Sequence, residues 1–248
     1  MALISLEDLD GLDDEQLDDD ITDHAEPMDE ENSDRLLAHW QEVGRGHQVS
    51  VPPEMTGPIQ EMTRNSQQRE TLTYVSVSRH EKLGEEVYEE RVYPAGNWVS
   101  VTSSEDLYEQ SISTAFMRLM KFICKDNSAG RYLGMTVPVV SSVQMMEDRK
   151  SFGKEVMTAF FLPAEFQQAP PTPNDPAITV LHREPIRVIA STFFGTTNEE
   201  TVLRQVTQLW EVLGERADVR PDAFMVAVYE NPGVPQRRNE IWFLCRNQ

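Results

Sequence analysis

The sequence contains the same order of predicted elements twice, and this internal repeat is the strongest constraint on the fold. In the first copy two strand-like stretches, EVYEERVYP and NWVSVTS, are followed by a helical stretch at 107–124 and then by MTVPVVSSVQM and EVMTAFFLP. The second copy runs AITVLHREP, IRVIASTFFG, a helical stretch at 199–214, FMVAVYENP and EIWFLC. Ile112 in the first helical stretch corresponds to Leu203 in the second. The sequence therefore predicts two units with the order strand, strand, helix, strand, strand.

Each predicted helix carries apolar residues at three- and four-residue spacing, which is typical of a helix with one buried face. The stripes are Ile112, Phe116, Leu119 and Ile123 in the first copy, and Val202, Val206, Leu209 and Leu213 in the second. A capping box at Thr197 and Glu200 begins the second helix, and Gly214 ends it. A proline-rich connector, 165–177, joins the two copies. We expect an α+β fold, a distorted eight-stranded β-barrel of two pseudo-twofold ββαββ halves with the helices outside.

The stretch GMTVPV, 134–139, reads as a strand because it is rich in β-branched residues, yet Pro138 lies inside it. Proline cannot donate to a sheet ladder and is tolerated at an edge or at the start of a strand. We therefore expect this strand to begin irregularly at a barrel rim.

The N-terminal part is set apart by its charge. Residues 1–34 contain fifteen Asp or Glu and no Lys or Arg, so they account for most of the net charge of −20. Such a segment cannot bury a core, and we expect 1–33 to be disordered. The predicted organisation is an acidic tail and linker, 1–70, followed by a globular domain, 71–248, which begins with the strand-like stretch TLTYVSVS.

A short amphipathic helix is predicted at 34–44, where Leu36, Leu37, Trp40 and Val43 recur at helical spacing before Gly44. Two interpretations remain open at this point. The helix either docks on the parent domain or, carried on a flexible tail, binds a protein partner through Leu37 and Trp40. Residues 45–70 resemble a linker with a weak helical turn.

Composition excludes several classes of function. The globular part is mildly acidic and has no cluster of Lys and Arg, so we expect no nucleic-acid binding. An anionic membrane surface would repel the tail, and no stretch of eighteen apolar residues exists, so we expect no membrane association. The first residues lack the pattern of a secretory signal. Cys124 and Cys245 are widely separated, which favours two reduced thiols over a disulfide. These features predict a cytoplasmic protein.

The sequence offers no convincing catalytic or metal site. There is no G-x-S-x-G, no phosphate-binding glycine loop and no pair of His or Cys at metal-ligand spacing. His182 is the one histidine inside the repeat, and a solvent-facing strand residue is the commoner interpretation of it. The chain is therefore not expected to be an enzyme.

One apolar surface bordered by cations remains as a candidate site. Phe116, Met117, Met120 and Lys121 lie close together on the first predicted helix, and thioethers adapt well to flat apolar ligands. Arg237 and Arg238 lie in a predicted hairpin loop, and arginine pairs bidentately with carboxylates. Ordinary core packing and a solvated turn are the competing interpretations of these two groups.

These residues belong to a wider resemblance. The segments YEERVYPAGNW, GMTVPV, FFLPAEFQQAPPTPNDPAI and RRNEIWFL resemble, in order and spacing, the SOUL/haem-binding-protein family over about residues 82–246. The resemblance implies a distorted barrel and a non-catalytic, intracellular binder of haem or another tetrapyrrole, acting as a buffer or carrier. The implied cleft lies between the first helix and the C-terminal hairpin loop. Carried over to this sequence, its residues are Ser113, Phe116, Met117, Met120, Lys121, Arg237 and Arg238.

Two departures from the family pattern affect the implied site. Some members carry a basic residue where this chain has Ser113, and some carry a histidine, suggested as an iron ligand, where it has Val92. Iron ligation at the second position is therefore excluded, and Met117, Met120 and His182 are the alternative candidates. The competing function is a protein-interaction module that acts through 34–44 or the barrel surface.

Overall fold

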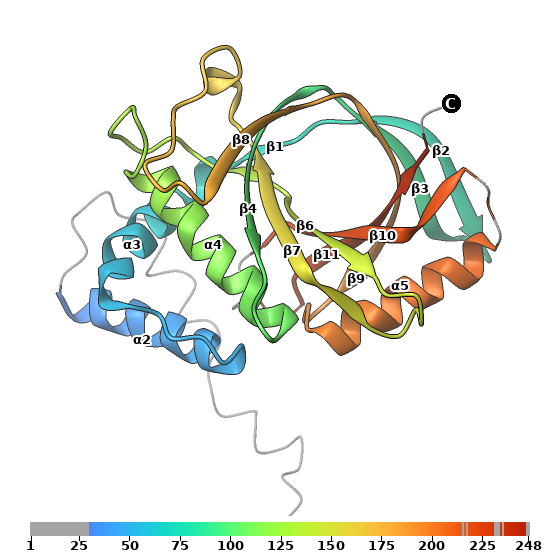
Figure 1. The fold of residues 1–248 in the computed structure, drawn as a ribbon, viewed down its shortest axis with the longest axis horizontal. Helices are drawn as coiled ribbons and strands as arrows, with labels where there is room; N and C mark the ends of the chain where they lie inside the picture. The colour runs from blue at the N-terminus through green and yellow to red at the C-terminus, as the bar shows by residue number, and fades with distance from the viewer. Residues whose placement is uncertain (1–29, 215, 217, 231–233, 235, 247–248) are drawn as a thin grey trace, which may run out of the picture.

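The computed structural model describes residues 30–214, 216, 218–230, 234 and 236–246 (Figure 1). Its helices are α2 (Glu30–Gly46), α3 (Thr56–Arg64), α4 (Tyr108–Cys124) and α5 (Glu199–Leu213), with short 3₁₀ turns at Pro53–Met55, Ser66–Gln68 and Ala164–Phe166. The strands are β1 (Glu70–Thr71), β2 (Val75–Lys82), β3 (Glu85–Tyr93), β4 (Gly96–Ser103), β5 (Thr136–Val137), β6 (Val139–Met145), β7 (Phe152–Phe161), β8 (Ile178–Arg183), β9 (Ile186–Phe194), β10 (Val219–Val228) and β11 (Arg238–Cys245). The predicted acidic tail, up to residue 29, lies outside the described residues.

The strand order reflects the sequence repeat. The main sheet runs β2-β3-β9-β11-β10-β6-β7-β4-β8. The two repeats are β3-β4-α4-β6-β7 and β8-β9-α5-β10-β11. When each strand is replaced by its counterpart in the other repeat, the eight repeat strands give the same order read from the opposite edge of the sheet. This is the topology of a pseudo-twofold arrangement. All pairings in the sheet are antiparallel.

The prediction of an eight-stranded barrel needs correction. In the described part of the chain the main sheet has nine strands, because β2 adds to the outer edge of β3. The sheet curls strongly, but its edge strands β2 and β8 are not paired with each other, so it is not closed (Figure 1). Every residue of β2 is exposed, and its charged residues Arg79, Glu81 and Lys82 discourage pairing with another strand.

Alternation along the strands divides the core into layers. In β11, Trp242 joins Tyr93 and Trp98 in a cluster on the concave side of the sheet, whereas Ile241 and Phe243 pack outward beneath α5. Successive side chains of a strand point to opposite faces, which produces this division. A third cluster lies between the sheet and α4. The sheet therefore buries both faces, and its two long helices cover the convex side (Figure 1).

Pro138 lies where the sequence predicts an irregular start. The stretch splits into β5 and β6, and the peptide bond between Val137 and Pro138 is cis. β5 pairs with β1 in a separate two-stranded ladder, whereas β6 pairs with β10 and β7. Because Pro138 stands between the two ladders, its missing N–H costs neither of them a hydrogen bond.

The N-terminal segment is more structured than predicted. α2 is longer than the predicted 34–44, and the assumed linker contains α3. Leu36, Leu37 and Trp40 pack against the cluster that contains the buried Met55 and Ile59. α2 is therefore docked on the domain, one of the two interpretations left open above. Both N-terminal helices lie on the side of α4 that faces away from the sheet (Figure 1).

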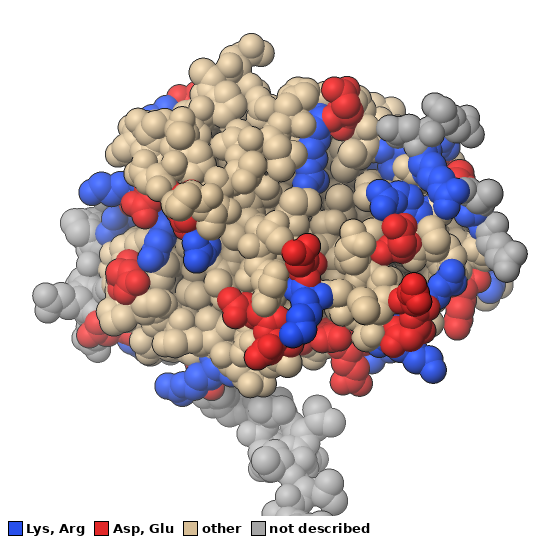
Figure 2. All heavy atoms as spheres, in the orientation of Figure 1, with Lys and Arg blue, Asp and Glu red and all other residues tan. Residues whose placement is uncertain are grey.

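The surface carries a mixture of charges. On the face shown in Figure 2, Lys and Arg side chains are interspersed with Asp and Glu and form no continuous basic patch. Within the described residues, no helix has the length and apolar character needed to cross a membrane. Both cysteines are buried and free, so the two do not form a disulfide.

Candidate functional site

The first half of the candidate site is an apolar cavity of about 140 Å³ between α4 and the N-terminal helices. The floor comes from one face of α4 together with Met135, Val137 and Val139. The roof comes from the N-terminal segment, whose lining residues are Trp40, Val43, Val49, Val51, Met55 and Ile59. The wall opposite α4's first turns is the β10–β11 hairpin, with Val228, Tyr229 and Arg237. Aromatic, β-branched and methionine side chains make this a surface suited to a flat apolar ligand.

α4 is rotated relative to its predicted orientation. The fully buried side chains that face the sheet are Ala115, Leu119, Phe122 and Ile123. Ile112 and Phe116, which the sequence assigns to the core stripe, are only partly buried and line the cavity. The correction follows from α4 having two apolar faces, one toward the sheet and one toward α2 and α3. Periodicity cannot separate two stripes on the same helix.

Four of the five predicted residues on α4 lie together in this cavity: Ser113, Phe116, Met117 and Met120. The fifth, Lys121, is not among the lining residues of either cavity described here. Its ammonium group lies 3.5 Å from a carboxylate oxygen of Glu54, in the turn before α3. The N-terminal segment therefore contacts α4 close to both ends of the predicted apolar surface.

The two adjacent arginines point in different directions. Arg237 lines the cavity, is 6% exposed and donates to the Thr197 hydroxyl at 3.3 Å. Arg238 is the first residue of β11 and shares the face of Glu240, to which it donates at 2.5 Å, and its guanidinium stacks over Tyr229. The structure thus brings Arg237 to the predicted surface but holds Arg238 on the other side of the strand.

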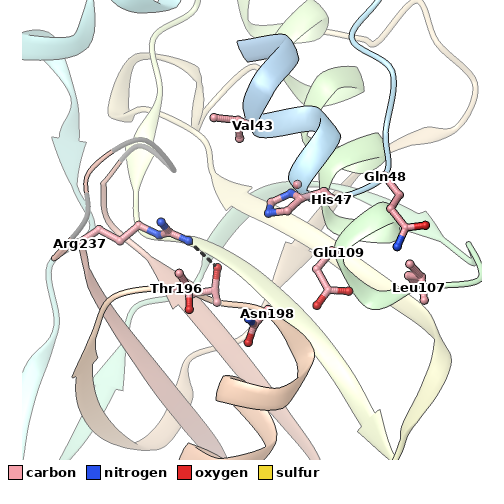
Figure 3. A pocket seen from close by; sticks show the side chains of 10 residues that line it. Val43, His47, Gln48, Leu107, Glu109, Thr196, Asn198 and Arg237 are labelled. Atoms are coloured by element: carbon pink, nitrogen blue, oxygen red, sulfur yellow. Dashed lines mark hydrogen bonds between the residues drawn. The ribbon is translucent and has the colours of Figure 1, made fainter. Parts of the chain in front are cut away.

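A second, more polar cavity of about 460 Å³ adjoins the first and shares Val43, His47, Thr197 and Arg237 with it. Figure 3 shows side chains from four separate segments around it: the end of α2, the start of α4, the turn before α5, and the turn before β11. Asn198 caps α5 by accepting from the Thr201 amide, and Glu109 accepts from the Glu199 amide. Burial lowers the pKa of Arg237, which nevertheless stays cationic at neutral pH.

His47 is the residue that sequence reasoning missed. It was assigned to the linker, yet its Nδ1 lies 2.7 Å from the Ser113 hydroxyl, and it lines both cavities. Gln48 beside it accepts, through its carbonyl oxygen, a hydrogen bond from Gln110 of α4. No local pattern around His47 predicts these contacts, because they depend on how α2 docks. His182 is exposed on β8 and lines neither cavity.

Acidification is expected to weaken the contact between α2 and α4. Burial lowers the pKa of His47 from its ordinary value near 6.5; Glu109 opposes this shift and Arg237 adds to it. The folded state thus disfavours the protonated ring, so stability present above about pH 6.5 is lost as pH falls through the lowered pKa. Protection factors for amide exchange in 36–47 should drop between about pH 7.5 and about pH 5.5. The drop should be absent in His47→Gln, and equal protection at both pH values in the wild type would contradict the assignment.

Among the residues that the structure describes, no three or more His, Cys, Asp or Glu side chains lie together in a group that could hold a metal ion. The cavity lining offers a ligand apolar contacts together with the cations Arg69 and Arg237 and the ring of His47. The described part of the chain is thus a curled antiparallel sheet of two like halves with an apolar cavity along its first helix, a cavity whose lining suits a small apolar ligand.

Comparisons with known proteins identify the family. Residues 69–244 match the family model described as SOUL heme-binding protein. Heme-binding protein 1 of Sus scrofa is 32% identical over 158 residues, which cover 63% of this chain and 83% of that protein. The Xenopus tropicalis protein of the same name is 31% identical over 172 residues, 69% of this chain and 90% of that protein. Heme-binding protein 2 of Homo sapiens is 27% identical over 164 residues, 65% of this chain and 79% of that protein.

The chain therefore belongs to the SOUL heme-binding protein family, as the resemblance of its four motifs predicted. The matched region begins at residue 69, so α2 and α3 lie outside it. The part of the chain that roofs the cavity thus lies outside the region that the family model matches.

Proposed function

We propose that this protein binds haem or a related tetrapyrrole without catalytic turnover, as a carrier or buffer. The observation that carries the proposal is that an apolar face of α4 and the buried cation Arg237 adjoin one another in a chain of the SOUL family. The relatives named above are described as heme-binding proteins. A tetrapyrrole combines a flat apolar ring with acidic side groups, and these two features match those two parts of the site.

The ring would lie against Phe116, Met117 and Met120. One carboxylate would reach Arg237, where a buried guanidinium with Thr197 beside it favours a charge-assisted hydrogen bond. Burying about 300 Å² of a ring face at about 25 cal/mol per Å² supplies several kcal/mol before the cost of association. Because association itself costs at least about 4 kcal/mol, this apolar contact alone gives weak binding, and the contact between the carboxylate and Arg237 has to add to it.

A haemin titration of the full chain, followed at the Soret band, tests the proposal. The wild type should show a saturable shift, and Arg237→Ala should weaken binding about tenfold, because a hydrogen bond to a charged group contributes about 1.5–3 kcal/mol. Arg220→Ala is the matched control, since Arg220 pairs with Asp222 at the start of β10 and lines neither cavity. It should bind as the wild type does. A flat wild-type titration would refute the proposal.

Lys121→Ala and Arg238→Ala test the two remaining predicted cations. Neither side chain lines the apolar cavity: Lys121 contacts Glu54, and Arg238 lies beside Glu240 on the other side of β11. We expect smaller losses of affinity than for Arg237→Ala. If either substitution lowered haemin affinity as much as Arg237→Ala does, the proposed contact between the ligand carboxylate and Arg237 would be wrong.

A further inference from the structure

The N-terminal segment 30–64, named the cover here, occupies the surface that the proposed ligand requires. α2, the turn Pro53–Met55 and α3 lie along the cavity side of α4, and Met55, Ile59 and Met62 are buried there. The space left against the apolar face of α4 is about 140 Å³, and the adjoining cavity of about 460 Å³ lies toward the start of α4 and has a more polar lining. Cavities that enclose drug-sized ligands measure about 300–1,000 Å³, and a tetrapyrrole is larger than most such ligands. The residues of the apolar cavity therefore suit a tetrapyrrole ring in chemical character, but the space between them and the cover is too small for that ring.

Polar contacts hold the cover at both ends of α4. At one end are His47 against Ser113 and the hydrogen bond from Gln110 to the Gln48 carbonyl. At the other are the ion pair between Lys121 and Glu54, at 3.5 Å, and a weak bond from the Cys124 thiol to the Pro58 carbonyl. Two of the four α4 residues in these contacts, Ser113 and Lys121, belong to the site predicted from sequence. The cover therefore competes for the same side chains as the ligand.

The cover is built as a separable unit. Its contacts with the rest of the chain run chiefly through α4 and the segment around Met135, and the pairing of the nine-strand sheet does not involve it. Its exposed pairs, such as Lys121 with Glu54, contribute little because solvent screens them. Apolar packing is the main attraction, and a large apolar ligand offers the same face of α4 equivalent contacts.

We propose that the cover is an autoinhibitory element: haem and the cover bind the same face of α4 in turn, and the ligand enters only when 30–64 is displaced. The inference rests on the proposed function, because it concerns the regulation of that site. Its consequence is that the apparent affinity of the full chain is the intrinsic affinity reduced by the fraction of molecules whose cover is open. Anything that binds or modifies the displaced cover would therefore raise haem affinity.

Gly44 provides a way to loosen the cover without touching α4. A Cβ at Gly44 would lie 2.7 Å from the backbone oxygen of Val49 and 2.9 Å from a methyl carbon of Val51. Since the backbone oxygen cannot move alone, Gly44→Ala must push the end of α2 away from the returning chain. Gly57→Ala is the matched control, because Gly57 is exposed in α3 and a Cβ there meets nothing within 4 Å. Both substitutions replace a helical glycine, so helix propensity changes in the same direction.

The experiment is a haemin titration of the full-length wild type and both variants, combined with amide hydrogen exchange of 30–64 with and without haemin. Gly44→Ala should bind haemin about three- to tenfold more tightly than the wild type, while Gly57→Ala should match it. In the wild type, saturation with haemin should accelerate exchange in 30–64. Haemin binding with equal affinity in all three proteins and unchanged or slower exchange in 30–64 would overturn the autoinhibition and leave the proposed function standing.

Two other outcomes are distinguishable. Absence of haemin binding in all three proteins would refute the proposed function itself, and the autoinhibition with it. Alternatively, His47 of the closed cover could ligate the haem iron. His47→Ala should then weaken haemin binding and shift the Soret band, and haemin should slow amide hydrogen exchange in 30–46. This result would also overturn the inference. Should Gly44→Ala fail to fold, the exchange measurement on the wild type still decides between displacement and retention of the cover.

Discussion

Replacing Arg91 by alanine is expected to destabilise the fold by about 3–5 kcal/mol, because it removes the buried cation that joins two buried carboxylates. The cations left beside those carboxylates, Arg79 and Arg238, are both more exposed than Arg91. Arg91 is 2% exposed; it donates to Glu89 at 2.6 Å and to both carboxylate oxygens of Glu240, at 3.1 and 2.9 Å. Burial alone would raise the pKa of Glu240, yet Arg91 and hydrogen bonds from Trp242 and Tyr229 hold it below its ordinary value. Urea unfolding at neutral pH measures the loss.

Arg79→Ala is the matched control for this prediction. Arg79 also donates to Glu89, at 3.2 Å, but its side chain is 60% exposed, so the substitution should cost less than about 1 kcal/mol. The difference between Arg91→Ala and the wild type should also shrink at acidic pH. Without Arg91, fewer groups oppose the effect of burial on the pKa of Glu240, so its neutral form, which needs no cation, is reached more easily as the pH falls. Equal losses for the two arginine variants would contradict the assigned network.

Phe122→Ala should destabilise the domain by about 3–5 kcal/mol, the typical cost of emptying a core position of this size. Phe122 is fully buried, and its cluster includes Val99 and Val101 of β4 and Phe160 of β7. It lies on the face of α4 that is turned toward the sheet, where no ligand or helix can refill the space. The free energy of unfolding from urea titration checks the prediction.

Phe116→Ala, on the same helix, is the comparison. Phe116 is partly buried and borders a cavity that already exists, so the loss of stability should be clearly smaller. The same substitution should weaken haemin binding, because it removes the aromatic ring from the proposed contact surface. If the two phenylalanine variants lost equal stability, the division of α4 into a sheet face and a ligand face would be wrong.

The local sequence pattern was sufficient to predict the order of strands and helices in both repeats. Strand alternation and helix periodicity depend on which residues are neighbours along the chain, and they located each strand and helix of both repeats near its observed position. The repeat also predicted related halves. The ninth strand, β2, was visible as TLTYVSVS, but periodicity does not say which partner a strand pairs with, so its addition beside β3 was missed.

The candidate site was predicted only in part, because residues adjacent in sequence diverge in space. Arg237 and Arg238 formed one predicted cation pair, yet the structure places Arg237 beside Thr197 and Arg238 beside Glu240. The position where β11 begins decides which arginine faces which side, and strand ends are the least predictable part of a pattern. The resemblance to the family implied five residues on the first helix. Ser113, Phe116, Met117 and Met120 line the cavity, whereas Lys121 does not.

The sequence by itself determined the two ββαββ units and the apolar character of the first helix, since both depend on residue spacing within short stretches. The family followed from the resemblance of four separate segments. Only the tertiary structure decided what covers that face. His47 meets Ser113 across 66 positions of the sequence, and Glu54 meets Lys121 across 67. Such contacts arise when two amphipathic helices bury their apolar sides against a third. Many partners satisfy that requirement equally well, so no single stretch of sequence specifies which one is chosen.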